Sequence, residues 1–370
     1  MELARLPLRR IGLRLADGID PTLLVLLLSL SMIGLATLYS ASYENSARVL
    51  AQLANLGVAL VAMWLIAQVP PQTMMRFAVP AYVIGLAFLV AVALFGDVVN
   101  GARRWLHVGV TRFQPSEMMK LALPLMLAWY FHKHETSLKL RNFGVAAMLL
   151  IVPLGLIARQ PDLGTAALVG AAGFYVIFFA GLSWRVLGTL LGLGLAALPI
   201  GWGFLHGYQR RRVLTLLDPT TDPLGAGYHI IQSTIAVGSG GLWGKGWLNG
   251  TQAHLEFIPE RHTDFIFAVF SEEFGLIGNV VLLVLYFLLV GRGLYVAANA
   301  ATVFARLLAG TISLMFFTYA FVNMGMVSGI LPVVGVPLPF LSYGGTALLT
   351  LFIGAGILMS VHRYRKLVQT

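Results

Sequence analysis

Long apolar stretches alternate with short polar segments along nearly the whole chain. A membrane-spanning helix needs roughly 20 mostly apolar residues to cross a hydrocarbon core of about 30 Å. The pattern therefore predicts an all-α polytopic membrane protein, with residues 1–370 forming a single integral membrane domain. Ten spanning helices are expected, at 21–40, 49–68, 76–96, 115–131, 142–158, 162–182, 184–205, 264–291, 303–326 and 342–361.

Two segments interrupt this pattern. Residues 206–263 form a long loop between the seventh and eighth predicted helices, rich in Gly but also in aromatic and apolar residues, which argues against a disordered tail. Residues 327–341 contain three prolines, Pro332, Pro337 and Pro339, and should not be helical. Because lipid cannot satisfy a non-helical backbone, we expect this second segment to be buried in protein or to line a cavity.

Composition and charge narrow the class of protein. Hydrophobic residues make up 58% of the chain and charged residues 11%, which excludes a soluble globule. Cysteine is absent, so disulfides and thiolate metal sites are excluded. The net charge of +10 comes from Lys and Arg at the ends of apolar runs, which indicates contact with membrane lipids and no nucleic-acid partner.

The distribution of positive charge predicts orientation. The first apolar run follows Arg5, Arg9, Arg10 and Arg14, and is too long for a signal peptide, so we expect an uncleaved first span. An even number of spans places both termini on one side, and the excess of Lys and Arg there predicts the cytoplasm. The loops 206–263 and 327–341 are then extracytoplasmic.

Several charged residues lie where a membrane protein usually has none. Glu117 and Lys120 are an i, i+3 pair inside a span and predict either an internal ion pair or a polar cavity. Asp162 begins the sixth helix, either as a helix N-terminal anion or as part of a cavity. Arg210 and Arg212 belong to a run of three arginines on the outer side, suited to phosphate groups or to lipid headgroups.

The most crowded polar stretch precedes the eighth helix and includes Glu260, Arg261, His262 and Asp264. A helix from Asp264 to Gly291 would be about 42 Å long, so its first turns should project into an outer vestibule. The residues alone allow Asp264 to be either a helix N-terminal anion or a general base. Glu272 and Glu273, deeper in the helix, are interpreted as structural carboxylates, at least one of them paired inside the bundle.

An ordered set of motifs resembles one family, the SEDS proteins (shape, elongation, division and sporulation), from the first span to the last. The residues of these motifs are more similar to the elongation branch than to the division branch, although Thr346 stands where serine is usual. The motifs are Gln114-Pro115-Ser116-Glu117 with Lys120, Gln160 to Thr165, Tyr208 to Arg212, Gly225 to Ser233, His262 to Ala268, Glu272 to Gly275 and Leu341 to Gly345.

This resemblance implies a peptidoglycan glycosyltransferase that polymerises lipid II into β-1,4 glycan strands during cell elongation. It implies a location in the bacterial cytoplasmic (inner) membrane, with the active site on the periplasmic face. It implies that Asp264 is the catalytic aspartate and that Glu117 and Lys120 lie in the central cavity. It also implies partners: the growing glycan strand, a class B penicillin-binding protein and other elongation proteins. The chain has no Ser-x-x-Lys motif of its own for the transpeptidase reaction.

Inverting transfer requires a base on the acceptor and positive charge near the leaving diphosphate. Asp264 is the predicted base. A divalent cation, Mg²⁺ or Mn²⁺, could share the work on the diphosphate, although the sequence shows no ligand set for it. The rival functions are a lipid II flippase and a non-catalytic scaffold of a cell-wall complex. The expected diphosphate-binding or cavity residues are Arg210, Arg212, Arg48, Lys120, His262 and Ser342.

Overall fold

The computed structural model describes residues 18–43, 45–99, 102–108, 111–160, 162–204, 207–222, 225–255, 257–258 and 260–365. Each of the ten predicted windows contains an α-helix, which confirms the all-α polytopic class. By length and composition alone, seven of the described helices qualify as spans, while α7 and α8 are apolar over shorter stretches. The ten are α2 (Pro21–Ala41), α3 (Ser46–Ala67), α4 (Pro71–Phe95), α5 (Pro115–Lys133), α6 (Leu140–Arg159), α7 (Leu163–Phe179), α8 (Trp184–Phe204), α12 (Ile266–Ala298), α13 (Val303–Val327) and α14 (Gly345–Arg363).

Side-chain caps and prolines fix where several of these helices begin. Asp20 accepts hydrogen bonds from the backbone of Thr22 and Leu23 at 3.0 and 3.2 Å, and proline follows it at the first position of α2. Thr302 caps α13 in the same way. These contacts satisfy backbone N–H groups that have no partner inside a helix, so each span starts at a defined residue.

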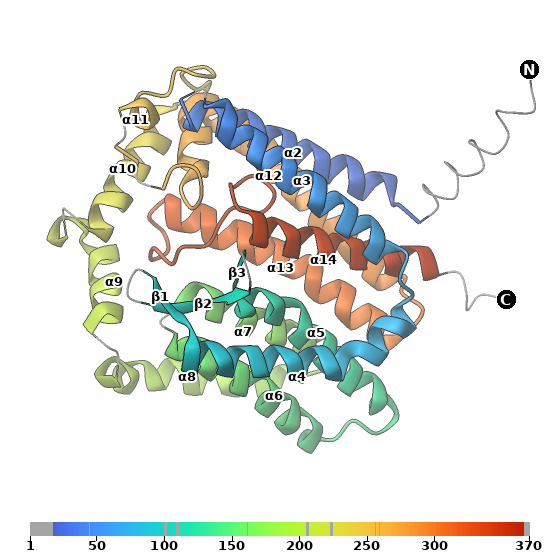
Figure 1. Ribbon diagram of the computed structural model, residues 1–370. Helices are drawn as coiled ribbons and strands as arrows, with labels where there is room; N and C mark the ends of the chain where they lie inside the picture. The colour runs from blue at the N-terminus through green and yellow to red at the C-terminus, as the bar shows by residue number, and fades with distance from the viewer. Residues whose placement is uncertain are drawn as a thin grey trace, which may run out of the picture.

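The helices form a bundle around α12, α13 and α14 (Figure 1). α13 packs against α12, α7 and α5, and its buried face includes Phe304, Phe316 and Tyr319. α2 and α3 cover one side of this centre, and α4 to α8 lie on the other. The polar residues discussed below sit where these two halves meet.

The start of α2 and the end of α14 meet on one side of the bundle. The carboxylate of Asp20, which is fully buried, lies 2.7 Å from a guanidinium nitrogen of Arg292 and 3.5 Å from the His362 ring. Asp20 therefore ties α2, α12 and α14 together at one end. This geometry agrees with an even number of crossings, whereas the assignment of that end to the cytoplasm stays a prediction.

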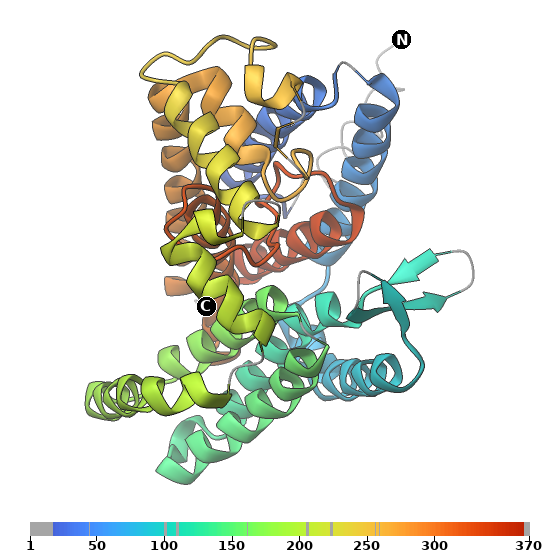
Figure 2. The ribbon, with the colours of Figure 1, turned by 90° about the vertical axis from the view of Figure 1, so that its left-hand side faces the viewer.

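A small antiparallel sheet, which the sequence patterns did not predict, follows α4. Its strands are β1 (Asp97–Val99), β2 (Ala102–Val108) and β3 (Thr111–Phe113), in the order β1-β2-β3. Strands of three to seven residues are too short to show a clear alternation of apolar and polar positions. The sheet stands away from the helices at the end of the bundle where α5 begins (Figure 2).

The long segment 206–263 is largely helical in its described parts rather than an irregular loop. It contains α9 (Gly207–Leu217), the short 3-10 helix η2 (Pro219–Thr221), α10 (Ala226–Ser239) and α11 (Thr251–His254). A second short 3-10 helix, η1 (Glu135–Ser137), joins α5 to α6. α10 packs along α12, so segment 206–263 covers the bundle on the side of α12.

The eighth predicted helix differs from expectation at both ends. α12 begins at Ile266 and continues to Ala298, so the expected start at Asp264 and end at Gly291 were wrong. Its first turns are buried in protein and do not project into an open vestibule, because α10 packs against α12. A kink at Gly275, with φ of +65°, brings the helix against the backbone of Gly244, where a β-carbon would lie 2.3 Å from the Gly244 nitrogen.

Glu272 and Glu273 are both buried, and Glu272 is paired, as expected for at least one of them. Glu272 accepts hydrogen bonds from Lys245 Nζ at 2.6 Å and from the backbone of Gln252 at 3.0 Å, which anchors the end of the long outer segment to α12. Glu273 accepts one from the hydroxyl of Ser40, which links α12 to α2.

Candidate functional site

Asp264 lies in the turn that immediately precedes α12. Ser342 Oγ donates to the carbonyl of Thr263 at 2.6 Å and accepts from the backbone of Leu338 at 2.8 Å. The backbone of Tyr343 donates to the carbonyl of His262 at 2.9 Å. The end of the proline-rich segment (327–341) and the two residues after it therefore hold this turn. Val336, Leu338 and Phe340 are buried, so this part of the segment is buried in protein as expected, whereas Ile330 is exposed.

The carboxylate of Asp264 faces Gly335. A β-carbon at this glycine, whose φ is +73°, would lie 3.3 Å from Asp264 Oδ2. None of the described residues forms a hydrogen bond or ion pair with the carboxylate. Burial raises the pKa of Asp264 to about 6, and the neighbouring Glu260 carboxylate acts in the same direction. At neutral pH the group is therefore mostly ionised and has no protein partner among the described residues.

His262 and Arg48 meet beside this turn. Arg48 Nη1 donates to His262 Nε2, which links α3 to the turn. Burial, together with the charges of Arg48 and Arg261, lowers the pKa of His262 to about 4. The ring is thus neutral at pH 7 and can accept the hydrogen bond. The guanidinium of Arg261 lies over the Tyr43 ring, 4.5 Å from its centre, and is therefore engaged in a cation-π contact.

α10 covers the turn through a ring contact. The His229 ring stacks on Phe265, with centroids 5.5 Å apart and planes at 17°. Burial lowers the pKa of His229, although Glu260 and Asp222 act against this effect. A neutral ring suits an apolar stack, so His229 helps to close the site on the side of the long outer segment.

Glu117 and Lys120 form the internal ion pair that their spacing suggests. Lys120 Nζ lies 2.5 Å from Glu117 Oε1 and 5.0 Å from the centre of the Tyr319 ring on α13. Both side chains are buried, Lys120 almost completely. The second oxygen of Glu117, Oε2, has no hydrogen-bond partner among the described residues. Lys120 is therefore already occupied, while one carboxylate oxygen of Glu117 is still able to accept a hydrogen bond.

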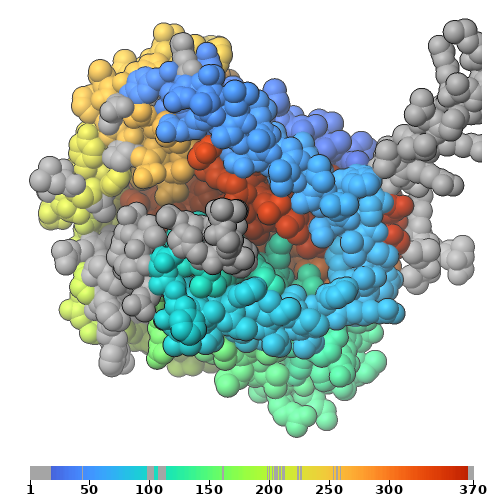
Figure 3. Space-filling model, viewed as in Figure 1, coloured from blue at the N-terminus to red at the C-terminus, as the bar shows by residue number. Residues whose placement is uncertain are grey.

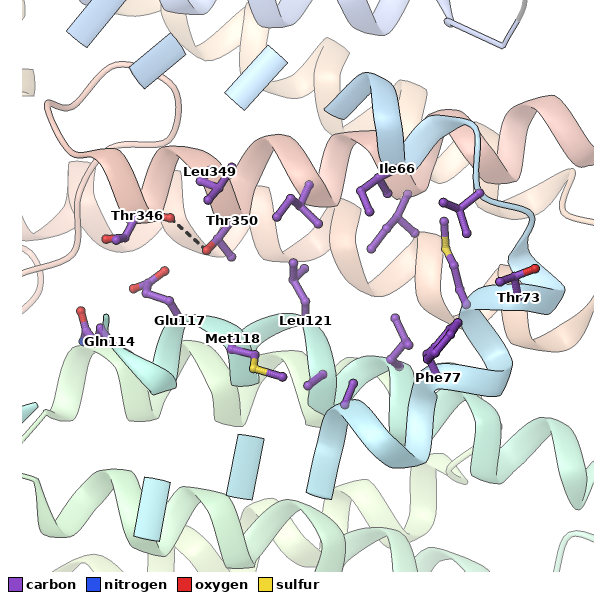
Figure 4. Close-up of a pocket in the computed structure, with 17 residues that line it drawn as sticks. Ile66, Thr73, Phe77, Gln114, Glu117, Met118, Leu121, Thr346, Leu349 and Thr350 are labelled. Carbon is purple, nitrogen blue, oxygen red and sulfur yellow. Dashed lines mark hydrogen bonds between the residues drawn. The ribbon is translucent and has the colours of Figure 1, made fainter. Parts of the chain in front are cut away.

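Glu117 also lines a cavity of about 620 Å³ between α3, α4, α5 and α14. The space-filling view shows a hollow between α3 and α4, with α14 visible at its base (Figure 3). Gln114 and Glu117 lie at one end of this cavity, and Ile66, Phe77 and Leu121 line it further along (Figure 4). The cavity is therefore a mostly apolar groove with polar groups at one end.

Asp162 makes hydrogen bonds at the start of α7 and at the start of α5. It caps α7 by accepting from the backbone of Thr165 at 3.1 Å, and it accepts from Gln114 Nε2 at 3.2 Å. The next glycine, Gly164, lies against the proline-rich segment, where a β-carbon would be 2.6 Å from the carbonyl oxygen of Val334. The helix N-terminal role of Asp162 is therefore observed, whereas its link to the cavity is indirect, through the hydrogen bond from Gln114, which lines it.

The outer arginines are not brought to Asp264 by any described contact. Arg210, in α9, donates to the carbonyl of Gly203 at 2.6 Å. Arg212 also belongs to α9, but its side chain lies outside the described residues. Of the arginines expected to bind diphosphate, Arg48 is the one that the structure places beside the turn.

Three polar residues at the site were missed in the sequence. Asn323 donates to the carbonyls of Asp264 and Val336, and Gln52 donates to that of Ser342 at 3.1 Å. Tyr319 faces Lys120. All three interrupt apolar windows, and a polar group inside a span is the signal that could have identified them. The described residues contain no group of three His, Asp or Glu side chains placed to hold a metal ion.

Comparisons with known proteins agree along the whole chain. The family model of the FtsW, RodA and SpoVE cell cycle proteins matches residues 21–367. The peptidoglycan glycosyltransferase MrdB of Escherichia coli is 53% identical over 351 residues, which cover 95% of each chain. A probable peptidoglycan glycosyltransferase FtsW of Trichlorobacter lovleyi is 36% identical, over 96% of this chain and 95% of that protein.

Two solved structures are also similar. One is a chain from a peptidoglycan synthase complex that coordinates polymerization and crosslinking, with a TM-score of 0.81 and 36% identity, over 94% of this chain and 98% of that one. The other is the rod shape determining protein RodA of Thermus thermophilus, with a TM-score of 0.71 and 31% identity, over 94% and 97%. The similarity in fold therefore extends over nearly the full length.

Proposed function

Since this chain belongs to the SEDS family of FtsW, RodA and SpoVE cell cycle proteins, we propose that it is a peptidoglycan glycosyltransferase that polymerises lipid II into β-1,4 glycan strands during cell elongation. The main support for this chemistry is the environment of the Asp264 carboxylate. It lies beside Gly335, it has no partner among the described residues, and it is mostly ionised at neutral pH.

The chemistry is an inverting displacement. The donor sugar is α-linked to a lipid diphosphate and the product linkage is β, so one attack at the anomeric carbon is sufficient. Asp264 accepts the proton from the acceptor 4-hydroxyl as that oxygen bonds to the anomeric carbon. The bond from the anomeric carbon to the diphosphate breaks, and the lipid diphosphate leaves with the electron pair. No covalent enzyme intermediate is required.

The leaving diphosphate needs positive charge. Arg48 is the best-placed candidate, because its guanidinium meets His262 two residues before Asp264, and a neutral His262 does not compete with a phosphate for that charge. Lys120 is already paired with Glu117. A Mg²⁺ or Mn²⁺ ion is kept as a proposed helper that would be held mainly by phosphate oxygens of the substrate.

The apolar groove suits the lipid carrier of the substrate. Its length is lined by aliphatic and aromatic side chains, while Gln114 and Glu117 mark the end from which the diphosphate and sugars would continue toward the proline-rich segment. The unpaired oxygen of Glu117 would accept a hydrogen bond from the sugar or peptide part. Binding of the carrier through apolar contact leaves the polar groups for orientation.

We further propose that the chain works with a class B penicillin-binding protein and other elongation proteins, on the growing glycan strand. Support comes from the similar chain in a synthase complex that combines polymerization with crosslinking. The proposed orientation, with cytoplasmic termini and Asp264 facing the periplasm, is supported by the distribution of Lys and Arg.

The direct test is strand formation from purified components. The protein and its transpeptidase partner, with the transpeptidase blocked, are supplied with labelled lipid II, and the products are separated by gel electrophoresis. We expect glycan strands. If the protein instead moves lipid II across the membrane of vesicles and forms no strands, it is a flippase. If it does neither but still binds its partner, it is a non-catalytic scaffold.

The rate should depend on pH in a defined direction. Because the ionised form of Asp264 is the base, the rate of strand formation should fall as pH drops through about 6, the raised pKa of that carboxyl. His262, with a pKa of about 4, should not contribute to this limb. The measurement is the initial rate at saturating lipid II between about pH 4.5 and 8. A flat profile across this range would contradict the assignment of Asp264 as the base.

A further inference from the structure

Asn323, on α13, joins the two segments that enclose the Asp264 carboxylate. Its Nδ2 donates to the carbonyl of Asp264 at 2.7 Å and to the carbonyl of Val336 at 2.7 Å. One acceptor belongs to the turn before α12 and the other to the proline-rich segment. Because both partners are carbonyl oxygens, only the amide nitrogen can face them, so the orientation of the side chain is fixed by chemistry.

The position of Val336 makes this contact specific to the site. Val336 directly follows Gly335, the residue that lies against Asp264 Oδ2. Two hydrogen bonds from one amide therefore set the distance between the backbone of Asp264 and the glycine that its carboxylate faces. Asn323 is completely buried, so solvent cannot replace it in this role.

We propose that Asn323 is a positioning residue that holds the Asp264 carboxylate in its place beside Gly335. The inference rests on the proposed function, in which Asp264 is the base. Without Asn323 the turn and the proline-rich segment would separate, the carboxylate would become more hydrated, and it would move away from the acceptor hydroxyl. Ser342 makes a parallel link from Thr263 to Leu338, so loss of Asn323 loosens the turn without releasing it.

Two substitutions test this proposal. Asn323→Leu preserves the approximate size and removes both donors, and Asn323→Ser retains one donor on a smaller side chain. Ser313→Ala is the matched control, because Ser313 is a fully buried polar residue of the same helix that donates to the carbonyl of Ala309, within α13, at 2.8 Å.

We expect Asn323→Leu to reduce strand formation per folded molecule by about ten- to a hundredfold, since small displacements of a reacting group have effects of this size. The low-pH limb of the rate profile should move down by roughly one pH unit as the Asp264 carboxylate becomes hydrated. Asn323→Ser should show a smaller change in the same direction. Ser313→Ala should show neither change.

The titratable and charged groups of this turn and of the elements packed against it are present in every variant, so they do not produce the difference. They are Glu260, which acts on Asp264 directly, Arg261 and His262 in the same turn, Arg48 from α3 and His229 from α10. A merely structural role for Asn323 would lower the yield of folded protein but leave the rate per folded molecule and the pH limb unchanged. That result in both variants would overturn the proposal.

A second measurement does not depend on activity. A carbodiimide modifies a carboxyl in its protonated form, and mass spectrometry reports the modification of Asp264 as a function of pH in wild type, Asn323→Leu and Asn323→Ser. We expect the midpoint of modification to fall in both variants, further in the first. Unchanged midpoints would overturn the positioning role even if wild type polymerises lipid II. If the midpoints shift but wild type does not polymerise lipid II, the positioning role of Asn323 holds and the proposed function is wrong.

Discussion

Replacement of Asp264 by asparagine is expected to slow strand formation by roughly 10²- to 10⁴-fold, the usual contribution of a general base. Asparagine keeps the size of the side chain and its place beside Gly335 but cannot accept the proton of the acceptor hydroxyl. The binding of lipid II should change little, because the base acts on a proton transfer that occurs in the transition state. The measurements are the rate at saturating lipid II and the KM.

The same substitution should not destabilise the protein at neutral pH. The pKa of Asp264 in the folded state is about 6, above the usual value of 3.8, so the folded protein binds a proton more readily than the unfolded chain does between these two pH values. Above pH 6 the ionised carboxylate therefore lowers the free energy of unfolding, by an amount on the order of 2–3 kcal/mol. Asp264→Asn removes this cost, so its Tm in detergent should equal or exceed that of wild type at pH 7.5 and lose this advantage at pH 4.

Glu260→Gln is the matched control for this experiment. Glu260 belongs to the same turn and is exposed, and its carboxylate accepts from Thr263 Oγ1 at 3.1 Å. We expect Glu260→Gln to retain most of the activity and to move the low-pH limb slightly downward, because the Glu260 charge raises the pKa of Asp264. Full activity of Asp264→Asn together with its wild-type pH profile would remove Asp264 from the chemistry.

The sequence predicted what depends on periodicity along the chain. Ten apolar windows became ten helices because a span must satisfy its backbone internally, whatever its neighbours are. The Glu117–Lys120 pair was predictable for a similar reason, since residues three apart on a helix share a face. The start of α12 was misplaced by two residues because the turn that holds Asp264 is fixed by Ser342 and Asn323, which are distant in sequence.

Contacts between distant segments carried no local signal. Asn323 reaches Asp264 from another helix, and Tyr319 reaches Lys120 from across the bundle, although each appears in the sequence only as a polar residue in an apolar window. The helices of the outer segment were missed because their apolar residues are mixed with glycine and turn residues. The fold class was therefore accessible from the sequence, and the choice of Asp264 as the base stays a prediction that rests on the family resemblance, whereas the residues that position Asp264 required the three-dimensional arrangement.

Replacement of Lys120 by methionine should affect stability and activity together. Lys120 is buried against Glu117 and Tyr319, so its removal leaves the Glu117 carboxylate in the bundle without a counter-charge. Breaking a buried pair in this way costs about 3–5 kcal/mol. We expect a markedly lower Tm, a lower yield of folded protein and little strand formation. Lys133→Met, at the exposed end of the same helix, is the control and should behave like wild type.

The double variant Glu117→Gln/Lys120→Met separates structure from function. Removing both charges removes the uncompensated carboxylate, so the Tm should recover to within a few degrees of wild type, since about 1 kcal/mol corresponds to a shift of roughly 2–4 °C in a protein larger than 150 residues. Strand formation should stay low, because the free oxygen of Glu117 at the polar end of the groove would be lost with its charge. Recovery of both Tm and rate would show that the pair only holds α5 and α13 in place, and the substrate headgroup would then have to be oriented by Gln114 and Asp162 alone.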